Sequence, residues 1–167
     1  MGKLESLNPI RKDSRFHQGY HKLENPHKLI GTYNAKMGVM FRSGLELKFI
    51  QLLDLSPRCI RWTYESDELI IPYYNPVKKK MCSYYPDFYI EMLGNSNRLL
   101  KYIIEVKSQK DTEKPDREKY KTKKAYLYQL ANSAVVEAKR MASLEYCKNK
   151  NMVYEYVTEE YFKKSNK

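Results

Sequence analysis

The chain has 167 residues, 42% of them hydrophobic, and carries 31 lysines and arginines against 20 aspartates and glutamates. This length can bury one hydrophobic core, while the short apolar runs exclude a membrane-spanning helix. The first thirty residues contain no apolar leader segment, so we expect a soluble protein that acts inside the cell that makes it. The formal net charge of +11 favours an anionic partner, usually nucleic acid. The alternative is a dispersed positive surface that only aids solubility.

Residues 1–40 are predicted to form an extended basic arm ahead of a domain over residues 41–167. Asn8-Pro9 and Asn25-Pro26 interrupt any long periodicity, and basic residues are spread along the segment. Such an arm could wrap the domain, lie along a DNA backbone or dock on a partner protein, and the sequence leaves these alternatives open.

The first helix is expected over residues 43–54. Ser43 as the N-cap and Glu46 three residues later form a capping box, and apolar residues recur after them at helical spacing. The helix start therefore gives Glu46 a structural role that competes with any chemical one.

Three strands are expected next, over residues 60–64, 69–74 and 84–91. A fourth, over residues 101–107, follows a turn at residues 94–97, and we expect the four to form a mostly antiparallel meander. Three successive lysines, Lys78, Lys79 and Lys80, lie between the second and third strands. Lysines in a turn are usually solvated, but beside a phosphodiester site they would contact a DNA backbone.

The last third of the chain is predicted to contain a polar loop over residues 108–124, a helix over 122–149 and a strand over 152–157. A short helix or tail begins at Thr158. This order of elements predicts an α/β (α+β) fold with a central mixed sheet flanked by helices. The residues expected on the buried face of the long helix are Leu127, Leu130, Ala131, Ala134, Val135, Ala138, Met141, Ala142 and Tyr146.

Two carboxylates and a lysine fall on the hairpin predicted over residues 84–107. Because Ile104 and Val106 point to one face of their strand, Glu105 and Lys107 share the other face. Asp87 follows a proline on the preceding strand, where the hairpin can bring it next to Glu105. Two carboxylates beside a lysine are suited to holding Mg²⁺ for phosphodiester hydrolysis.

The same pattern also arises by chance in a chain with so many charges. Glu46-Leu47-Lys48 and Pro115-Asp116 each fit one half of it. The hairpin is favoured because its residues lie on two consecutive strands with apolar partners, whereas Pro115-Asp116 lies in a polar segment without a strand pattern. The alternative is that the hairpin residues are solvated side chains on an outward face.

The order of elements, together with Glu46, Pro86-Asp87 and Glu105-Val106-Lys107, resembles the PD-(D/E)XK nuclease superfamily. Several stretches are similar to the head-completion nucleases of tailed bacteriophages. These stretches are Phe41 to Glu46, Tyr85 to Phe88, Ile104 to Lys107, Asn132 to Lys139, Glu145 to Cys147 and Val157 to Glu159. That family usually has a tryptophan before the helix glutamate, where this chain has Leu45.

The resemblance implies a restriction-endonuclease-like core and a deoxyribonuclease that uses Mg²⁺, or Mn²⁺ in its place. Asp87 and Glu105 would hold the ion together with the Val106 carbonyl oxygen, and Glu46 would be a further ligand or would position a water. Lys107 would orient that water or stabilise the transition state. The residues expected to contact nucleic acid are Arg42, Lys78, Lys79, Lys80 and Gln109.

The biology implied by the resemblance is phage head completion and head-to-tail joining after DNA packaging. The expected partners are double-stranded DNA and phage head, portal and neck proteins, in the host cytoplasm during assembly or within the virion. Two alternatives remain open. One is a structural neck or head adaptor on a nuclease-like fold, and the other is a recombination or repair nuclease, such as a Holliday junction resolvase or a transposase subunit.

Overall fold

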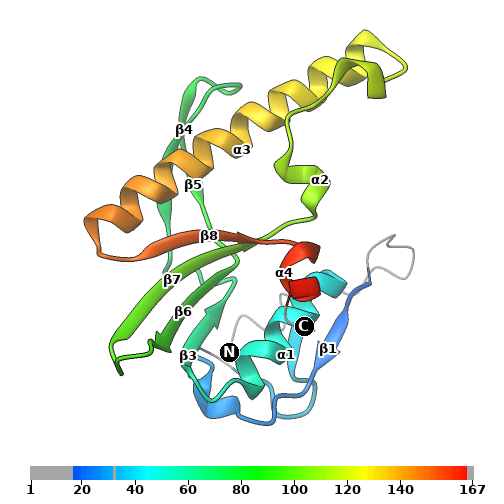
Figure 1. Cartoon of the computed structure of the whole chain (residues 1–167). Helices are drawn as coiled ribbons and strands as arrows, with labels where there is room; N and C mark the ends of the chain where they lie inside the picture. Colours follow the sequence, from blue (N-terminus) through cyan, green and yellow to red (C-terminus); the bar gives the residue numbers. More distant parts are fainter. Residues whose placement is uncertain (1–16, 32, 165–167) are drawn as a thin grey trace.

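Figure 1 shows a computed structural model of the chain, which describes residues 17–31 and 33–164. A central four-stranded sheet has α1 (Gly44–Leu55) packed on one face and α3 (Lys123–Asn149) near the other. None of the described helices is both long enough and apolar enough to span a membrane. The predicted mixed sheet flanked by helices is confirmed.

The central sheet contains β3 (Cys59–Tyr64), β6 (Phe88–Leu93), β7 (Leu99–Val106) and β8 (Val153–Val157), in that order. The first three strands are antiparallel, and β8 runs parallel to β7. The parallel pair requires a crossover, and α3 provides it. The last predicted strand and the hairpin turn after β6 are therefore both confirmed.

The predicted meander is wrong, because β3 pairs directly with β6. The intervening strands, β4 (Ile71–Asn75) and β5 (Lys80–Tyr84), pair only with each other and form a separate hairpin. The strand predicted over residues 84–91 is confirmed only from Phe88 onward, since Tyr84 ends β5 and residues 85–87 belong to no strand. Pro86 cannot donate a ladder hydrogen bond, so the chain leaves β5 there before it enters β6.

The start of α1 agrees with the predicted capping box. The Glu46 backbone N–H donates to the Ser43 hydroxyl oxygen at 3.2 Å, and the Ser43 hydroxyl donates to the Glu46 carboxylate at 3.0 Å. The same carboxylate accepts from the Arg42 backbone N–H at 2.8 Å. The first bond satisfies an N–H group that a helix start otherwise leaves without a partner, and the other two hold the Glu46 side chain over the first turn.

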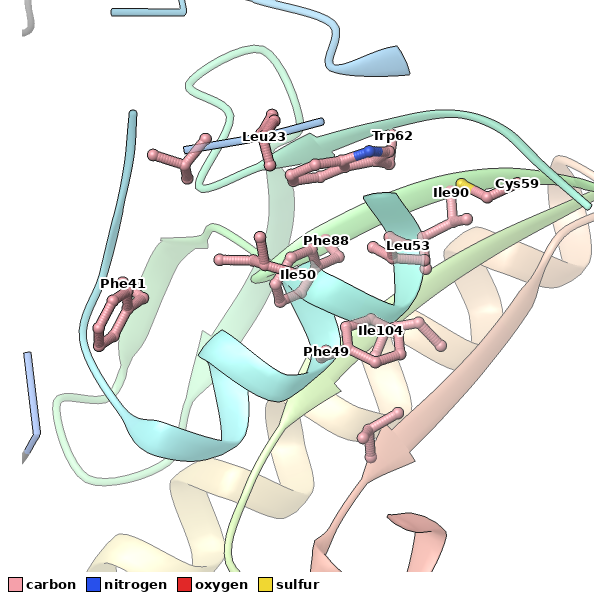
Figure 2. Close-up of a cluster of buried hydrophobic side chains, with 12 residues drawn as sticks. Leu23, Phe41, Phe49, Ile50, Leu53, Cys59, Trp62, Phe88, Ile90 and Ile104 are labelled. Atoms are coloured by element: carbon pink, nitrogen blue, oxygen red, sulfur yellow. The ribbon is translucent and has the colours of Figure 1, made fainter. Parts of the chain in front are cut away.

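The core between α1 and the sheet is built from aliphatic and aromatic side chains, shown in Figure 2. The rings of Phe49 from α1 and Phe88 from β6 meet edge to face, with centroids 5.0 Å apart. Trp62 on β3 is fully buried in the same cluster. Burial of side chains of this size contributes about 1.5–3 kcal/mol each to the free energy of unfolding.

Residues 17–31 and 33–41 lie against this core, whereas residues 1–16, part of the predicted arm, lie outside the described residues. Strand β1 (Gly19–His21) pairs with β2 (Val39–Phe41), and η2 (Pro26–Lys28) lies between them in the chain. Leu23 and Val39 are buried in the same cluster as Phe49, Trp62 and Phe88, which we call the α1 cluster. The Ile30 N–H donates to the Trp62 carbonyl oxygen at 2.7 Å, which joins this segment to β3.

Asp54, at the end of α1, fixes the N-terminal segment to the domain. Its carboxylate accepts from the backbone N–H groups of Glu24 at 2.7 Å and Asn25 at 2.8 Å, while its side chain is buried. The Asp54 carbonyl oxygen also accepts from the Lys28 ammonium at 2.8 Å. A buried carboxylate is retained here because two N–H donors satisfy it.

We expect Asp54→Ala to lower the free energy of unfolding by roughly 2–4 kcal/mol, because it leaves two partly buried N–H groups without an acceptor. Urea denaturation followed by circular dichroism measures this change. Glu68→Ala is the matched control, since Glu68 is exposed and its side chain bonds to no described residue. Equal midpoints for the two variants would contradict the role given to Asp54.

The segment before α3 is more ordered than predicted. Residues 108–124 contain α2 (Gln109–Thr112) and η3 (Arg117–Lys119) in place of a simple loop, and Thr122 caps α3. Helix α4 (Glu159–Lys164) follows β8, as predicted.

The buried face predicted for α3 is only partly right. Val135, Ala138, Ala142 and Tyr146 pack against the second core cluster, between α3 and the sheet. Leu127, Leu130 and Met141 are 44–54% exposed, so their predicted burial is wrong. For Leu127 and Leu130 the cause is the length of α3, whose N-terminal half extends beyond the sheet (Figure 1), whereas Met141 lies in the C-terminal half and is not part of the second cluster.

Candidate active site

The hairpin of β6 and β7 brings the predicted acidic pair to one end of the sheet. Phe88 is in register with Ile104, so Asp87 and Glu105 are the next residues outward on their strands. The Val106 backbone N–H donates to the Asp87 carboxylate at 2.8 Å. Ile104 packs in the α1 cluster and Ile103 in the opposite one, which confirms the predicted alternation along β7.

Glu105 is 9% exposed and is held by two side-chain donors. The Tyr84 hydroxyl donates to one carboxylate oxygen, and the Lys107 ammonium donates to the other at 3.0 Å. Burial lowers the Lys107 pKa, but the charge and hydrogen bond of Glu105 outweigh this effect and leave that pKa raised. Lys107 therefore carries its positive charge at neutral pH.

Asp87 lies in a buried position that disfavours its negative charge. Burial, followed by the charge of Glu105 and more weakly that of Glu46, raises the Asp87 pKa to about 8, although the Val106 hydrogen bond opposes the shift. The raised pKa means that ionisation of Asp87 beside the charged Glu105 is unfavourable unless a cation neutralises the pair. The hairpin end therefore has the electrostatic character of a cation site.

Glu46 approaches this end of the hairpin from α1. Its carboxylate accepts from the Tyr64 hydroxyl on β3 and from the backbone at the helix start. Burial and then the charge of Glu46 raise the Tyr64 pKa, so the phenol stays a hydrogen-bond donor. Glu46 thus keeps its capping role while its charge contributes to the field at Asp87.

The acids are not gathered as a preformed three-ligand cluster. Among residues 17–31 and 33–164, no group of three or more histidine, cysteine, aspartate or glutamate side chains is arranged to hold a metal ion. The three acids bond instead to different donors. Glu46 accepts from the Tyr64 hydroxyl, Asp87 from the Val106 N–H and Glu105 from the Tyr84 hydroxyl. Mg²⁺ commonly uses only one or two protein carboxylates and keeps several waters, so Asp87 and Glu105 fit that ion as a donor set.

Sequence reasoning missed the two tyrosines that hold the acids. Tyr84 ends β5 and Tyr64 ends β3, and they contact Glu105 and Glu46 across 21 and 18 residues of sequence. No local pattern marks such contacts, because they depend on how β5 and β3 are placed around the hairpin. The Lys139 ammonium lies 5.0 Å from the centre of the Tyr84 ring and connects this group to α3.

If Glu105 holds a metal ion for DNA cleavage, Tyr84→Phe should reduce that cleavage about 10-fold, in the range seen when residues that orient a metal ligand are removed. The free energy of unfolding should fall by about 1–2 kcal/mol, because one hydrogen bond to a buried carboxylate is lost. Single-turnover cleavage and urea denaturation measure the two effects. Tyr74→Phe, an exposed position on the same hairpin, is the matched control. Cleavage by Tyr84→Phe at the rate of Tyr74→Phe would rule out the positioning role.

The residues predicted to contact nucleic acid lie in three separate places. Arg42 forms an ion pair with Glu65 at 2.6 Å. Gln109 is exposed at the start of α2, where its backbone N–H donates to the Glu159 carboxylate at 2.7 Å. The three lysines, Lys78, Lys79 and Lys80, are exposed at the turn between β4 and β5.

The lysine turn is not next to the acids. Lys80 begins β5 and Tyr84 ends it, so the turn lies about 13 Å along the strand from the Tyr84 contact with Glu105. The turn could therefore reach only a part of a long ligand that is distant from the acidic pair. Its contact with nucleic acid stays a prediction.

Comparison with known proteins gives one family. The family model of the TnsA-like endonuclease N-terminal domain matches residues 56–159, which is more than half of the chain. The matched range includes Asp87, Glu105 and Lys107 and begins after Glu46. No curated protein and no solved structure matches the chain. The match agrees with the predicted restriction-endonuclease-like fold and nuclease superfamily, and does not extend to phage head completion. The chain belongs to the family of TnsA-like endonuclease N-terminal domains.

Proposed function

We propose that the protein is a Mg²⁺-dependent DNA nuclease that hydrolyses phosphodiester bonds at the end of the β6–β7 hairpin. The observation that carries the proposal is the placement of Asp87 against the Val106 N–H and of Glu105 against Lys107. Two carboxylates and a fixed ammonium ion at one strand end are the groups that metal-assisted hydrolysis needs. The family match and the charge of +11 both support DNA as the substrate.

Asp87 and Glu105 would hold the metal ion, which when bound lowers the pKa of a water and neutralises phosphate charge. The protein's own contribution is orientation and charge. The Val106 N–H fixes the Asp87 carboxylate, and the Tyr84 hydroxyl fixes that of Glu105. Lys107, whose side chain is 21% exposed, places a positive charge where negative charge develops on the phosphate.

The test is digestion of plasmid and linear duplex DNA with Mg²⁺, with Mn²⁺ and with EDTA. We expect cleavage with either metal ion and a loss on the order of 100-fold or more with EDTA, restored by excess Mg²⁺. Equal cleavage with and without the chelator would contradict the metal dependence. Preferential cleavage of branched over linear DNA would favour the recombination or repair nuclease instead.

We also propose that this nuclease activity serves phage head completion. It rests on the stretches that resemble head-completion nucleases, which include Phe41 to Glu46 and Tyr85 to Phe88. Complementation of a phage that lacks its head-completion nuclease tests it. We expect wild-type protein to restore joined particles and Glu105→Ala to fail. If Glu105→Ala also restored joining, the structural adaptor role would be favoured over the enzymatic one.

A further inference from the structure

We propose that the protein binds one unpaired nucleotide of its DNA substrate in a pocket beside Lys107, an inference that rests on the proposed nuclease function. The pocket has a volume of about 570 Å³ and lies between residues 107–120 and one face of α3. This volume is within the range of about 300–1,000 Å³ found for small-molecule sites. Lys107 lines the pocket and also bonds to Glu105, so a ligand in the pocket would lie next to the candidate active site.

The α3 wall of the pocket presents hydrogen-bonding side chains. Gln129, Asn132, Ser133 and Val136 follow the spacing i, i+3, i+4 and i+7, which places them on one helix face. Within the part of the chain that the structure describes, the side chains of the first three bond to no other residue. An amide side chain can donate to and accept from a base edge at the same time.

The opposite wall supplies positive charge. Lys110, Lys114 and Lys119 line it, and none of them forms an ion pair with another described residue. Three acids, Asp111, Glu113 and Asp116, line the same pocket, so with Lys107 the four lysines leave a net positive lining. Lysines of this kind are suited to contacting phosphate oxygens.

Flat side chains complete the lining. Tyr120 and Pro115 contribute apolar surface, and the centroids of the Tyr120 and Tyr126 rings lie 6.0 Å apart with the ring planes tilted at 50°. Any of the four bases can stack on a tyrosine ring, because each base has a flat aromatic face. Ammonium groups for a phosphate, amides for a base edge and a ring for a base face together describe a nucleotide.

The nucleotide is inferred to be unpaired for a physical reason. In a duplex the pairing edge of each base is occupied by its partner and its faces are stacked, so neither is free for a pocket of this kind. A base outside the stack presents both at once. The pocket therefore favours a DNA end or branch with single-stranded character beside the scissile phosphate.

The test is fluorescence anisotropy in EDTA, so that no cleavage occurs, with a blunt DNA hairpin and the same hairpin carrying a three-nucleotide tail. We expect wild-type protein to bind the tailed DNA about 5- to 10-fold more tightly, an effect the size of about one stacked base. The Gln129→Ala/Asn132→Ala variant should bind both DNAs equally. Asn149→Ala, an exposed asparagine at the other end of α3, should keep the preference.

Three results would each overturn the pocket. Wild-type protein binds the two DNAs equally, wild-type protein binds neither, or the double variant keeps the preference. If the double variant is unfolded by circular dichroism, Ser133→Trp replaces it, because a large side chain at that position fills the pocket. Failure of the nuclease proposal is separable. If the tail preference is present but Mg²⁺-dependent cleavage is absent, the enzyme is rejected and the pocket is retained. If cleavage is present but the tail preference is absent, only the pocket is rejected.

Discussion

Asp87→Asn is expected to lower metal-dependent DNA cleavage on the order of 100-fold or more, measured as single-turnover rates with saturating protein. The amide can still accept the Val106 N–H bond, so the local geometry is kept while the negative charge is lost. The free energy of unfolding in EDTA should not fall. Burial and the charge of Glu105 already disfavour the ionised carboxylate, as the Asp87 pKa of about 8 indicates.

Two results would contradict this prediction for Asp87. One is cleavage by Asp87→Asn at the rate of Glu145→Gln, a matched change at an exposed position on α3. The other is a large loss of stability, which would indicate that Asp87 is needed for folding and not for chemistry. A lost rate with an unchanged urea midpoint separates catalysis from folding.

Lys107→Ala is expected to lower the rate of cleavage by about 100- to 1,000-fold at saturating DNA, because a preorganised charge next to the reacting phosphate is removed. Lys107→Arg should restore little of it, since a planar guanidinium cannot take the place of a compact ammonium ion beside Glu105. Binding of blunt duplex DNA in EDTA should change by less than about 3-fold, since one phosphate contact among many is lost.

The control for Lys107 lies on the same strand. Lys101 is exposed on β7 and is in register with Glu91 on β6, away from the acidic pair. Lys101→Ala should cleave at the wild-type rate. An equal, small effect of both substitutions would show that Lys107 acts only as one more positive charge on the surface.

Local sequence signals predicted the elements that depend on neighbouring residues. The capping box at Ser43 and Glu46 located α1, and the alternation along residues 103–106 correctly separated the two faces of β7. The turn at residues 94–97 placed Asp87 and Glu105 at one strand end, because a hairpin with a short turn has its register fixed by that turn. These signals operate over a few residues, so one sequence is enough to find them.

The features that the sequence did not reveal depend on distant parts of the chain. Pairing of β3 with β6 requires the β4–β5 hairpin to be set aside, and only the position of Pro86 hints at that division. The exposure of Leu127 and Leu130 follows from the extension of α3 beyond the sheet, which helical periodicity cannot show. Tyr84 was missed as a partner of Glu105 because its contact is made between elements.

The attachment of the N-terminal segment to Trp62 and Asp54 has a consequence for how this domain can be exchanged between proteins. The family match begins at residue 56, yet Leu23, Phe49 and Leu53 fill the same core as β3 and β6. A transplanted unit cut at residue 56 would leave the aromatic face of its sheet in water. A recombinant form of this domain should therefore include the N-terminal segment and α1, so the unit that folds is larger than the region that the family model matches.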